Sequence, residues 1–268
     1  MDVLIQPPDL LADPSRYVVL DVRWKLGGPP GHGEYLAGHI PGAVYVPLEP
    51  ELAVHGVPTD GRHPLPNPAD LQQAARRWGV SEGDTVVAYD DNGGLAAARA
   101  WWLLRWAGFD NVLLLDGGLA AWRAVGGALE TVDVRPEPGD VVLSQGEVPT
   151  IDIEGAATFD GVLLDARAGE RYRGEAEPID PKAGHIPGAV SAPTTNNLDA
   201  DGRFRSAEDL RRQFEALGVR DGVPIAAYCG SGVTAAHEVA ALAIAGFDAA
   251  LYPGSWSQWS NHDKPVAT

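Results

Sequence analysis

The sequence contains a single cysteine, Cys229, in 268 residues. One cysteine excludes an intrachain disulfide and any metal site built from several thiolates, and it is typical of a reducing compartment. Long apolar runs are also missing, because charged residues such as Arg99 and Arg105 interrupt them before they reach the roughly 18 residues of a membrane-spanning helix. The N-terminus has no basic residues leading into an apolar core, as a secretory signal would. We therefore expect a cytoplasmic protein with no membrane partner.

Basic residues are scarce: 20 Lys and Arg stand against 37 Asp and Glu, which gives a net charge of −17. Such a chain repels phosphate backbones, and this argues against a nucleic-acid partner. A hydrophobic content of 45% and a charged content of 21% are typical of a globular protein. The length suffices for two domains of ordinary size.

The sequence repeats itself once. The segment Gly-His-Ile-Pro-Gly-Ala-Val at 38–44 recurs unchanged at 184–190, and residues 19–23 are echoed at 163–167. Repeats that keep their order predict two homologous domains. We predict an N-terminal domain over 1–128, a Pro- and Gly-containing linker over 129–150 and a C-terminal domain over 151–268.

Within each half, short apolar runs alternate with helical patterns. Residues 85–89 and 225–228 predict buried strands, and residues 68–78 predict a helix capped by Asn67 with Pro68 in its first turn. Alternating strands and helices predict an α/β fold in each half, with a central parallel sheet covered by helices on both faces.

The cysteine stands between a predicted strand and a predicted helix, a position at which open α/β sheets bind their ligands. Glycines let the backbone N–H groups after it converge, and the helix adds the positive end of its dipole. Both features favour the thiolate over the thiol. We interpret Cys229 as a catalytic nucleophile; the substrate-binding loop after it consists of Gly230, Ser231, Gly232, Val233 and Thr234. A lone cysteine can equally be a small core residue, but a core residue needs no such loop.

The equivalent loop in the first half has Asp90 in place of the cysteine. A carboxylate cannot act as a sulfur nucleophile. We therefore expect the first domain to be inactive, and to contribute walls to a cleft between the halves.

The duplicated halves, the two Gly-His-Ile-Pro-Gly-Ala segments and the Cys-Gly-Ser-Gly-Val-Thr loop resemble the two-domain rhodanese family of sulfurtransferases. The likeness covers nearly the whole chain. It implies a rhodanese-like fold in each half, an inactive loop at Asp90 and a persulfide on Cys229. It further implies a small-molecule sulfur donor, cyanide or a thiol such as thioredoxin as the acceptor, and neither a metal nor an organic cofactor.

The loop sequence divides this family by donor. Thiosulfate-preferring members carry basic residues after the cysteine, whereas 3-mercaptopyruvate-preferring members carry Gly-Ser-Gly or Gly-Thr-Gly. Gly230 and Ser231 therefore favour 3-mercaptopyruvate, with thiosulfate as the alternative donor. The resemblance places the substrate-binding arginine at Arg171. The second arginine of mercaptopyruvate enzymes is missing from residues 177–182, where Lys182 is the basic residue that could take its place.

Some mercaptopyruvate enzymes are argued to relay protons through the loop serine, a histidine and an aspartate. Ser231 and His39 match two of these positions, and the third falls near Pro30, which has no carboxylate. His39 and His185 occupy the same place in the two halves although only one half has a thiol. We therefore interpret both histidines as structural.

Two other functions fit parts of the sequence. A cysteine phosphatase of this fold needs an arginine six residues after the cysteine, where this chain has Ala235. A non-catalytic module that carries a persulfide to a partner would keep the same loop, and steady-state turnover with a free thiol acceptor distinguishes it from an enzyme.

Overall fold

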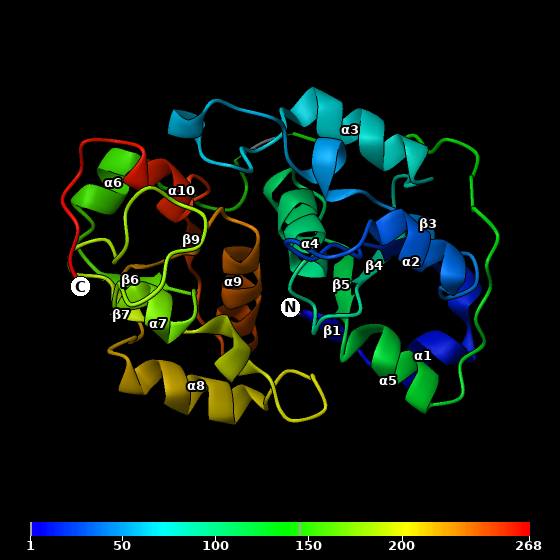
Figure 1. Cartoon of the computed structure of the whole chain (residues 1–268). Coiled ribbons are helices and arrows are strands. Elements are labelled where there is room, and N and C mark those ends of the chain that lie inside the picture. Colours follow the sequence, from blue (N-terminus) through cyan, green and yellow to red (C-terminus); the bar gives the residue numbers. More distant parts are fainter. Residues whose placement is uncertain (1, 145) are drawn as a thin grey trace. The chain divides into compact units, whose positions relative to one another are not determined.

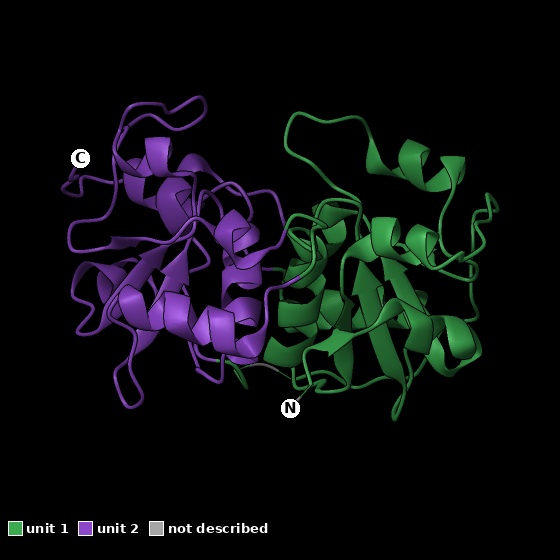
Figure 2. Ribbon diagram, turned by 90° about the horizontal axis from the view of Figure 1, so that it is seen from below, with its two compact units in different colours: residues 1–53, 66–148, 200–203 green, residues 54–65, 149–199, 204–268 purple. Residues whose placement is uncertain are grey.

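The computed structural model describes residues 2–144 and 146–268, which form two compact units (Figure 2). Unit 1 comprises residues 1–53, 66–148 and 200–203, and unit 2 comprises residues 54–65, 149–199 and 204–268. Each unit thus includes a short segment from the other half of the sequence. The predicted boundaries, which place a single linker between continuous domains, do not include this exchange.

Unit 1 is built on a five-stranded parallel sheet in the order β1-β5-β4-β2-β3 (Figure 1). Its strands are β1 (Leu4–Ile5), β2 (Tyr17–Asp21), β3 (Val44–Tyr45), β4 (Thr85–Tyr89) and β5 (Val112–Leu115). Its helices are α1 (Pro7–Ala12), α2 (Gly31–Ala37), α3 (Pro68–Arg77), α4 (Ala97–Trp106) and α5 (Gly118–Ala124).

Unit 2 is built on a four-stranded parallel sheet in the order β7-β6-β8-β9. Its strands are β6 (Val162–Asp165), β7 (Val190–Ser191), β8 (Ile225–Tyr228) and β9 (Ala250–Leu251). Its helices are α6 (Ile153–Ala157), α7 (Gly169–Tyr172), α8 (Ala207–Ala216), α9 (Thr234–Ile244) and α10 (Ser255–Ser260).

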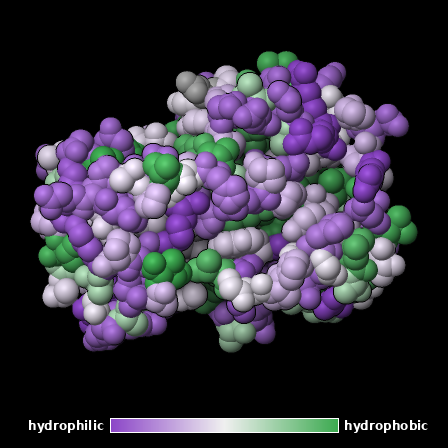
Figure 3. Space-filling view, turned by 45° about the horizontal axis from the view of Figure 1, so that its top comes forward, coloured by the Kyte–Doolittle hydropathy of each residue, from purple (hydrophilic) through white to green (hydrophobic). Residues whose placement is uncertain are grey.

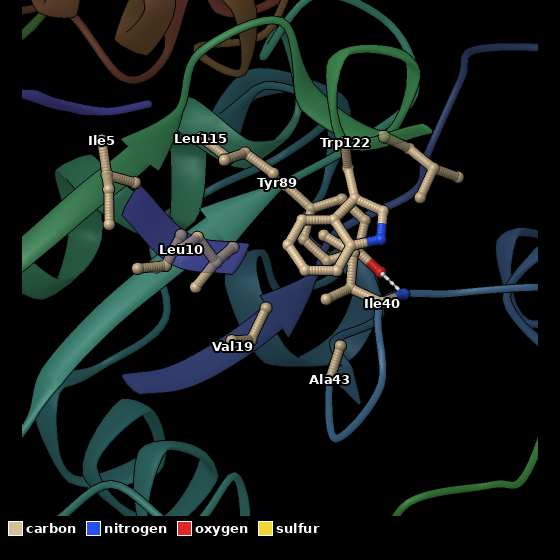
Figure 4. Close-up of a cluster of buried hydrophobic side chains, with 10 residues drawn as sticks. Ile5, Leu10, Val19, Ile40, Ala43, Tyr89, Leu115 and Trp122 are labelled. Atoms are coloured by element: carbon tan, nitrogen blue, oxygen red, sulfur yellow. Dashed lines mark hydrogen bonds between the residues drawn. The ribbon is translucent and has the colours of Figure 1, made fainter. Parts of the chain in front are cut away.

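Both sheets are covered on their two faces, because successive side chains of a strand point to opposite sides. In unit 1, Val87 and Tyr89 of β4 pack in one cluster with Trp122 of α5 (Figure 4). The other face of β4 contacts α4. In unit 2, Tyr228 of β8 packs with Trp256 of α10, and α9 contacts β8 and β9. This arrangement confirms the predicted α/β fold class.

The repeated sequence motifs form one buried network in each unit. In unit 2, Arg167 binds the Asp165 carboxylate through Nε and Nη2 and donates from Nη2 to the carbonyl of Gly184 at 2.7 Å. The Tyr228 hydroxyl donates to Asp165 at 2.7 Å and accepts the N–H of Ile186 at 3.2 Å. The same contacts recur in unit 1 among Asp21, Arg23, Gly38, Tyr89 and Ile40. The network ties the central strand to the repeated Gly-His-Ile-Pro-Gly-Ala segment.

The two repeated histidines hold these segments in place. The His39 ring stacks on Tyr35, and its Nδ1 lies 2.9 Å from the Tyr35 carbonyl oxygen. His185 repeats the arrangement with Tyr172, at 2.8 Å. Both rings serve the local fold of their own unit, in agreement with the structural interpretation.

The face drawn in Figure 3 is mostly hydrophilic, and its hydrophobic residues form small separate groups. None of the helices in the described part of the chain has the length and apolar composition needed to cross a bilayer.

Helix α9 carries a buried carboxyl group that makes stability depend on pH. Burial raises the pKa of Glu238 to about 7, although Asn197 donates a hydrogen bond to the carboxylate at 2.7 Å. The folded state therefore holds this proton more tightly than the unfolded state, so stability falls as the pH rises from 4.5 to about 7. The variant Glu238→Gln cannot ionise there. We expect the variant to gain about 3 kcal/mol in unfolding free energy relative to the wild type across this window, as measured by urea denaturation at a series of pH values. Parallel pH profiles for the two proteins would contradict the prediction.

Candidate active site

The single cysteine lies at the carboxyl end of a central strand of unit 2. Cys229 directly follows β8 and begins the loop that leads into α9 at Thr234. Its side chain is 2% exposed, and its Sγ accepts the backbone N–H of Gly232 at 3.2 Å. The loop thus turns back over the sulfur and directs an amide hydrogen at it. A negative charge on the sulfur is stabilised by such a contact.

The shape of the loop depends on glycine. Gly232 has a φ of +79°, and a Cβ atom there would lie 2.4 Å from the carbonyl oxygen of Pro253. The first turn of α10 holds the loop from outside, since the N–H groups of Trp256 and Ser257 donate to the carbonyls of Cys229 and Gly230 at 3.0 and 2.8 Å. Backbone hydrogen bonds therefore tie the loop to α10.

The equivalent loop of unit 1 is filled by its own carboxylate. Asp90 is fully buried and accepts four backbone N–H groups, from Asn92, Gly94, Ala96 and Ala97, at 2.8 to 3.0 Å. Burial raises the pKa of Asp90, and the four hydrogen bonds act in the opposite direction. The duplicated loop can therefore direct four backbone amides at one acceptor group. In unit 1 the residue that occupies this place has no sulfur.

Two arginines lie beside the cysteine loop. Arg171 of α7 donates from Nη2 and Nε to the Glu177 carboxylate, at 2.7 and 3.2 Å. Arg62, from the segment 54–65, forms an ion pair with Asp180 through Nη1. A Cβ atom on Gly230 would lie 3.1 Å from Nη2 of Arg62 and 3.3 Å from Nη1 of Arg171. Both cations therefore lie against the residue that follows the cysteine.

The serine of the loop is paired with a histidine. The Ser231 hydroxyl lies 2.7 Å from Nδ1 of His63, and both side chains are 7% exposed. The histidine beside Ser231 is therefore His63 and not His39, which was interpreted as structural. His39 holds the backbone of its own segment, whereas His63 reaches Ser231 because the segment 54–65 packs in unit 2.

Lys182 does not supply the missing second cation of the loop. Its Nζ donates to the carbonyl oxygens of His262 and Lys264 at 2.6 and 3.3 Å, so it fastens the C-terminal segment. Arg62, rather than Lys182, is the second cation beside Gly230.

The structure therefore brings together most of the residues selected from sequence: Cys229, Arg171, Gly230, Ser231 and Gly232, with Val233 and Thr234 completing the turn into α9. Sequence reasoning missed Arg62 and His63. One signal was available, because Asp-Gly-Arg at 60–62 recurs at 201–203, and these repeats lie in the two exchanged segments. Among the described residues, no group of three or more His, Cys, Asp or Glu side chains is arranged to hold a metal ion.

Comparison with known proteins identifies both halves. The model of the rhodanese-like domain matches residues 8–125 and again residues 152–262. A putative thiosulfate sulfurtransferase, SseB of Mycobacterium tuberculosis, is 49% identical over 91% of this chain and 87% of that protein. A probable 3-mercaptopyruvate sulfurtransferase of Pseudomonas aeruginosa is 48% identical over 98% of this chain and 94% of that protein.

The fold is also that of a solved relative. The crystal structure of the 3-mercaptopyruvate sulfurtransferase SseA from Escherichia coli matches with a TM-score of 0.83 and 31% identity, over 96% of this chain and 99% of that one. With both domain matches, the relatives and the shared fold in agreement, the chain belongs to the rhodanese family of sulfurtransferases.

Proposed function

We propose that the enzyme takes sulfur from 3-mercaptopyruvate onto Cys229 as a persulfide and passes it to a thiol or to cyanide. The observation that carries this proposal is the environment of Sγ, which accepts the Gly232 N–H and heads a loop flanked by Arg62 and Arg171. This is the environment of a nucleophile rather than of a core cysteine.

The first half-reaction is a displacement at the donor sulfur. The Cys229 thiolate forms an S–S bond with that sulfur, and the donor C–S bond breaks with its electron pair passing to carbon 3. The proton lost from the donor thiol ends on carbon 3, which gives pyruvate and a Cys229 persulfide. The acceptor then attacks the outer sulfur and restores the Cys229 thiolate. The N–H of Gly232 stabilises the charged sulfur in both half-reactions.

Ser231 and His63 handle the proton in this proposal. Their 2.7 Å contact places a hydroxyl and an imidazole next to the nucleophile, on the loop where the donor sulfur binds. We expect Ser231→Ala to lower kcat with 3-mercaptopyruvate by about a hundredfold, the usual contribution of general acid–base catalysis. Thiosulfate loses sulfite without needing a proton, so its kcat serves as the internal control and is expected to stay unchanged. Equal losses with the two donors would remove Ser231 from proton transfer.

The charge of the site supports 3-mercaptopyruvate as donor. Arg62 and Arg171 are balanced by Asp180 and Glu177, and the residues that follow Cys229 are Gly230 and Ser231. A donor with one negative charge suits a balanced site better than the dianion thiosulfate. Thiosulfate is the second candidate, since the 49% identical relative is named for it.

Steady-state kinetics on one preparation test the proposal. We expect kcat/KM for 3-mercaptopyruvate to exceed that for thiosulfate with the same thiol acceptor. The reverse order would establish thiosulfate as the donor. Failure to turn over either donor would leave a non-catalytic persulfide carrier. Thioredoxin, as a dithiol of the reducing compartment to which the single cysteine points, is the protein acceptor that we propose.

A further inference from the structure

Arg62 and Arg171 each leave part of the guanidinium group without an acceptor, and the unused parts meet at Gly230. We propose that the two arginines form one clamp for the carboxylate of a 2-oxo acid donor, and that Arg62 is a specificity-determining residue of the enzyme. This inference rests on the proposed function and names the group that recognises the donor.

The clamp follows from how each guanidinium is used. Arg171 donates hydrogen bonds from Nε and Nη2 to Glu177, and no described residue accepts a hydrogen bond from its Nη1. Arg62 donates a hydrogen bond from Nη1 to Asp180, whereas its buried Nε has no hydrogen-bond partner among the described residues. The atoms that face the loop are Nη1 of Arg171 and Nη2 of Arg62. The buried Nε of Arg62 lacks an acceptor, which is costly, and the two Nη groups beside Gly230 keep N–H donors available for a ligand that accepts hydrogen bonds.

Asp180 and Glu177 hold the two arginines in position without occupying the side of each guanidinium group that faces the loop. Asp180 and Glu177 are each 3% exposed, and Asp180 also accepts a hydrogen bond from Arg171 at 3.4 Å. Burial raises the pKa of Asp180, and the charge of Arg62 acts most strongly against that rise. Glu177 further accepts the N–H groups of Ile179 and Asp180. Each guanidinium is therefore held on one side by a buried carboxylate, with its other side directed at the loop.

The chemistry of the free N–H groups selects the ligand. A planar carboxylate can accept from two guanidinium groups at once, and such charged hydrogen bonds are among the strongest in proteins. The clamp lies beside Gly230, next to the nucleophile, so a donor bound by its carboxylate presents its other end to Cys229. A 2-oxo acid with a thiol on carbon 3 has these groups in the required order.

The test compares 3-mercaptopyruvate with 1-mercapto-2-propanone, which carries a methyl group in place of the carboxylate. We expect Arg62→Gln to raise the KM for 3-mercaptopyruvate by on the order of ten- to a hundredfold, the effect of one charged hydrogen bond. The kcat for 3-mercaptopyruvate and the kcat/KM for the ketone are expected to stay unchanged. Arg62→Lys keeps the positive charge opposite Asp180 but loses the forked guanidinium group. Its KM for 3-mercaptopyruvate should lie between those of the wild type and Arg62→Gln.

The matched control is Arg173→Gln. Arg173 lies two residues from Arg171 in the sequence, but its side chain is exposed and paired with Glu175. Its replacement should therefore leave KM and kcat unchanged for both donors. If Arg62→Gln lowers kcat/KM equally for 3-mercaptopyruvate and for the ketone, or for neither, the proposed role of Arg62 is overturned. Thermal melts of Arg62→Gln and Arg62→Lys show whether either variant is misfolded.

A binding experiment separates this inference from the proposed reaction. Cys229→Ser retains the arginines without the nucleophile, so pyruvate can be titrated into it calorimetrically whatever donor the enzyme uses. We expect pyruvate to bind, and the addition of Arg62→Gln to weaken binding at least about tenfold. Absent pyruvate binding, or equal affinity in the single and double variants, would overturn the clamp even if persulfide transfer is demonstrated.

Discussion

Replacing Cys229 with serine is expected to lower kcat/KM for sulfur transfer by at least about a thousandfold with any donor. A serine hydroxyl is not ionised at neutral pH and cannot hold a transferable sulfur as a persulfide. The two side chains are similar in size, and the backbone at this position is held independently of the sulfur: the Cys229 N–H donates to the Ser255 hydroxyl, and the Cys229 carbonyl accepts the N–H of Trp256. The fold should therefore remain, with an unfolding free energy within about 1–2 kcal/mol of the wild type.

The covalent step can be followed on the same pair of proteins. Because Cys229 is the only cysteine, the mass of the intact chain after donor treatment reports on this sulfur alone. The wild type should gain the mass of one sulfur atom and lose it when cyanide is added, whereas Cys229→Ser should gain nothing. Turnover near the wild-type rate in a folded Cys229→Ser protein would remove Cys229 from the mechanism.

Replacing Arg167 with alanine is expected to cost about 3–5 kcal/mol of unfolding free energy, the usual effect of breaking a buried ion pair. The Arg167 and Asp165 side chains are 1% and 0% exposed. Burial alone would lower the pKa of Arg167, but its hydrogen bond to Asp165 and the charge of Asp165 raise that pKa above the usual value. The guanidinium also lies 4.5 Å from the centre of the Trp256 ring. Alanine leaves the Asp165 carboxyl group buried and without this partner.

Urea denaturation of Arg167→Ala and of a surface control measures the effect. Arg212 of α8 pairs with Glu208, but the two side chains are 61% and 83% exposed. Arg212→Ala should cost less than about 1 kcal/mol, because water screens an exposed pair. Similar losses in the two variants would show that the Asp165–Arg167 pair does not anchor unit 2.

Local elements were predictable where the sequence pattern and the fold agree. The predicted strand at 85–89 is β4, and the predicted helix at 68–78 is α3, which ends at Arg77. Asn67 caps α3 as expected, since its side chain accepts the N–H of Asp70 at 2.9 Å. These features depend on alternation, helical periodicity and capping, which act between residues close in sequence.

The pairing of loop residues with distant side chains was not predictable in the same way. The family resemblance offered only His39 as a histidine for Ser231, and His39 was interpreted as structural, whereas the structure pairs Ser231 with His63. The repeated Asp-Gly-Arg marks Arg62, but a repeat does not show whether an arginine lies on the surface or packs against a loop more than a hundred residues away. Both residues reach the site through the segment 54–65, which folds with the opposite half of the sequence.

The sequence by itself determined the duplication, the α/β class and the position of Cys229 at the end of a strand. Strand and helix patterns depend on residues close in sequence, and a repeat is found by comparing the sequence with itself. Only the tertiary structure decided that Arg62 and His63 lie beside the cysteine loop, since both come from the segment 54–65, which packs with the other half of the sequence in unit 2. The physical reason is that burial and ion pairing depend on neighbours in space, and local patterns along the chain do not reveal which distant residues become those neighbours.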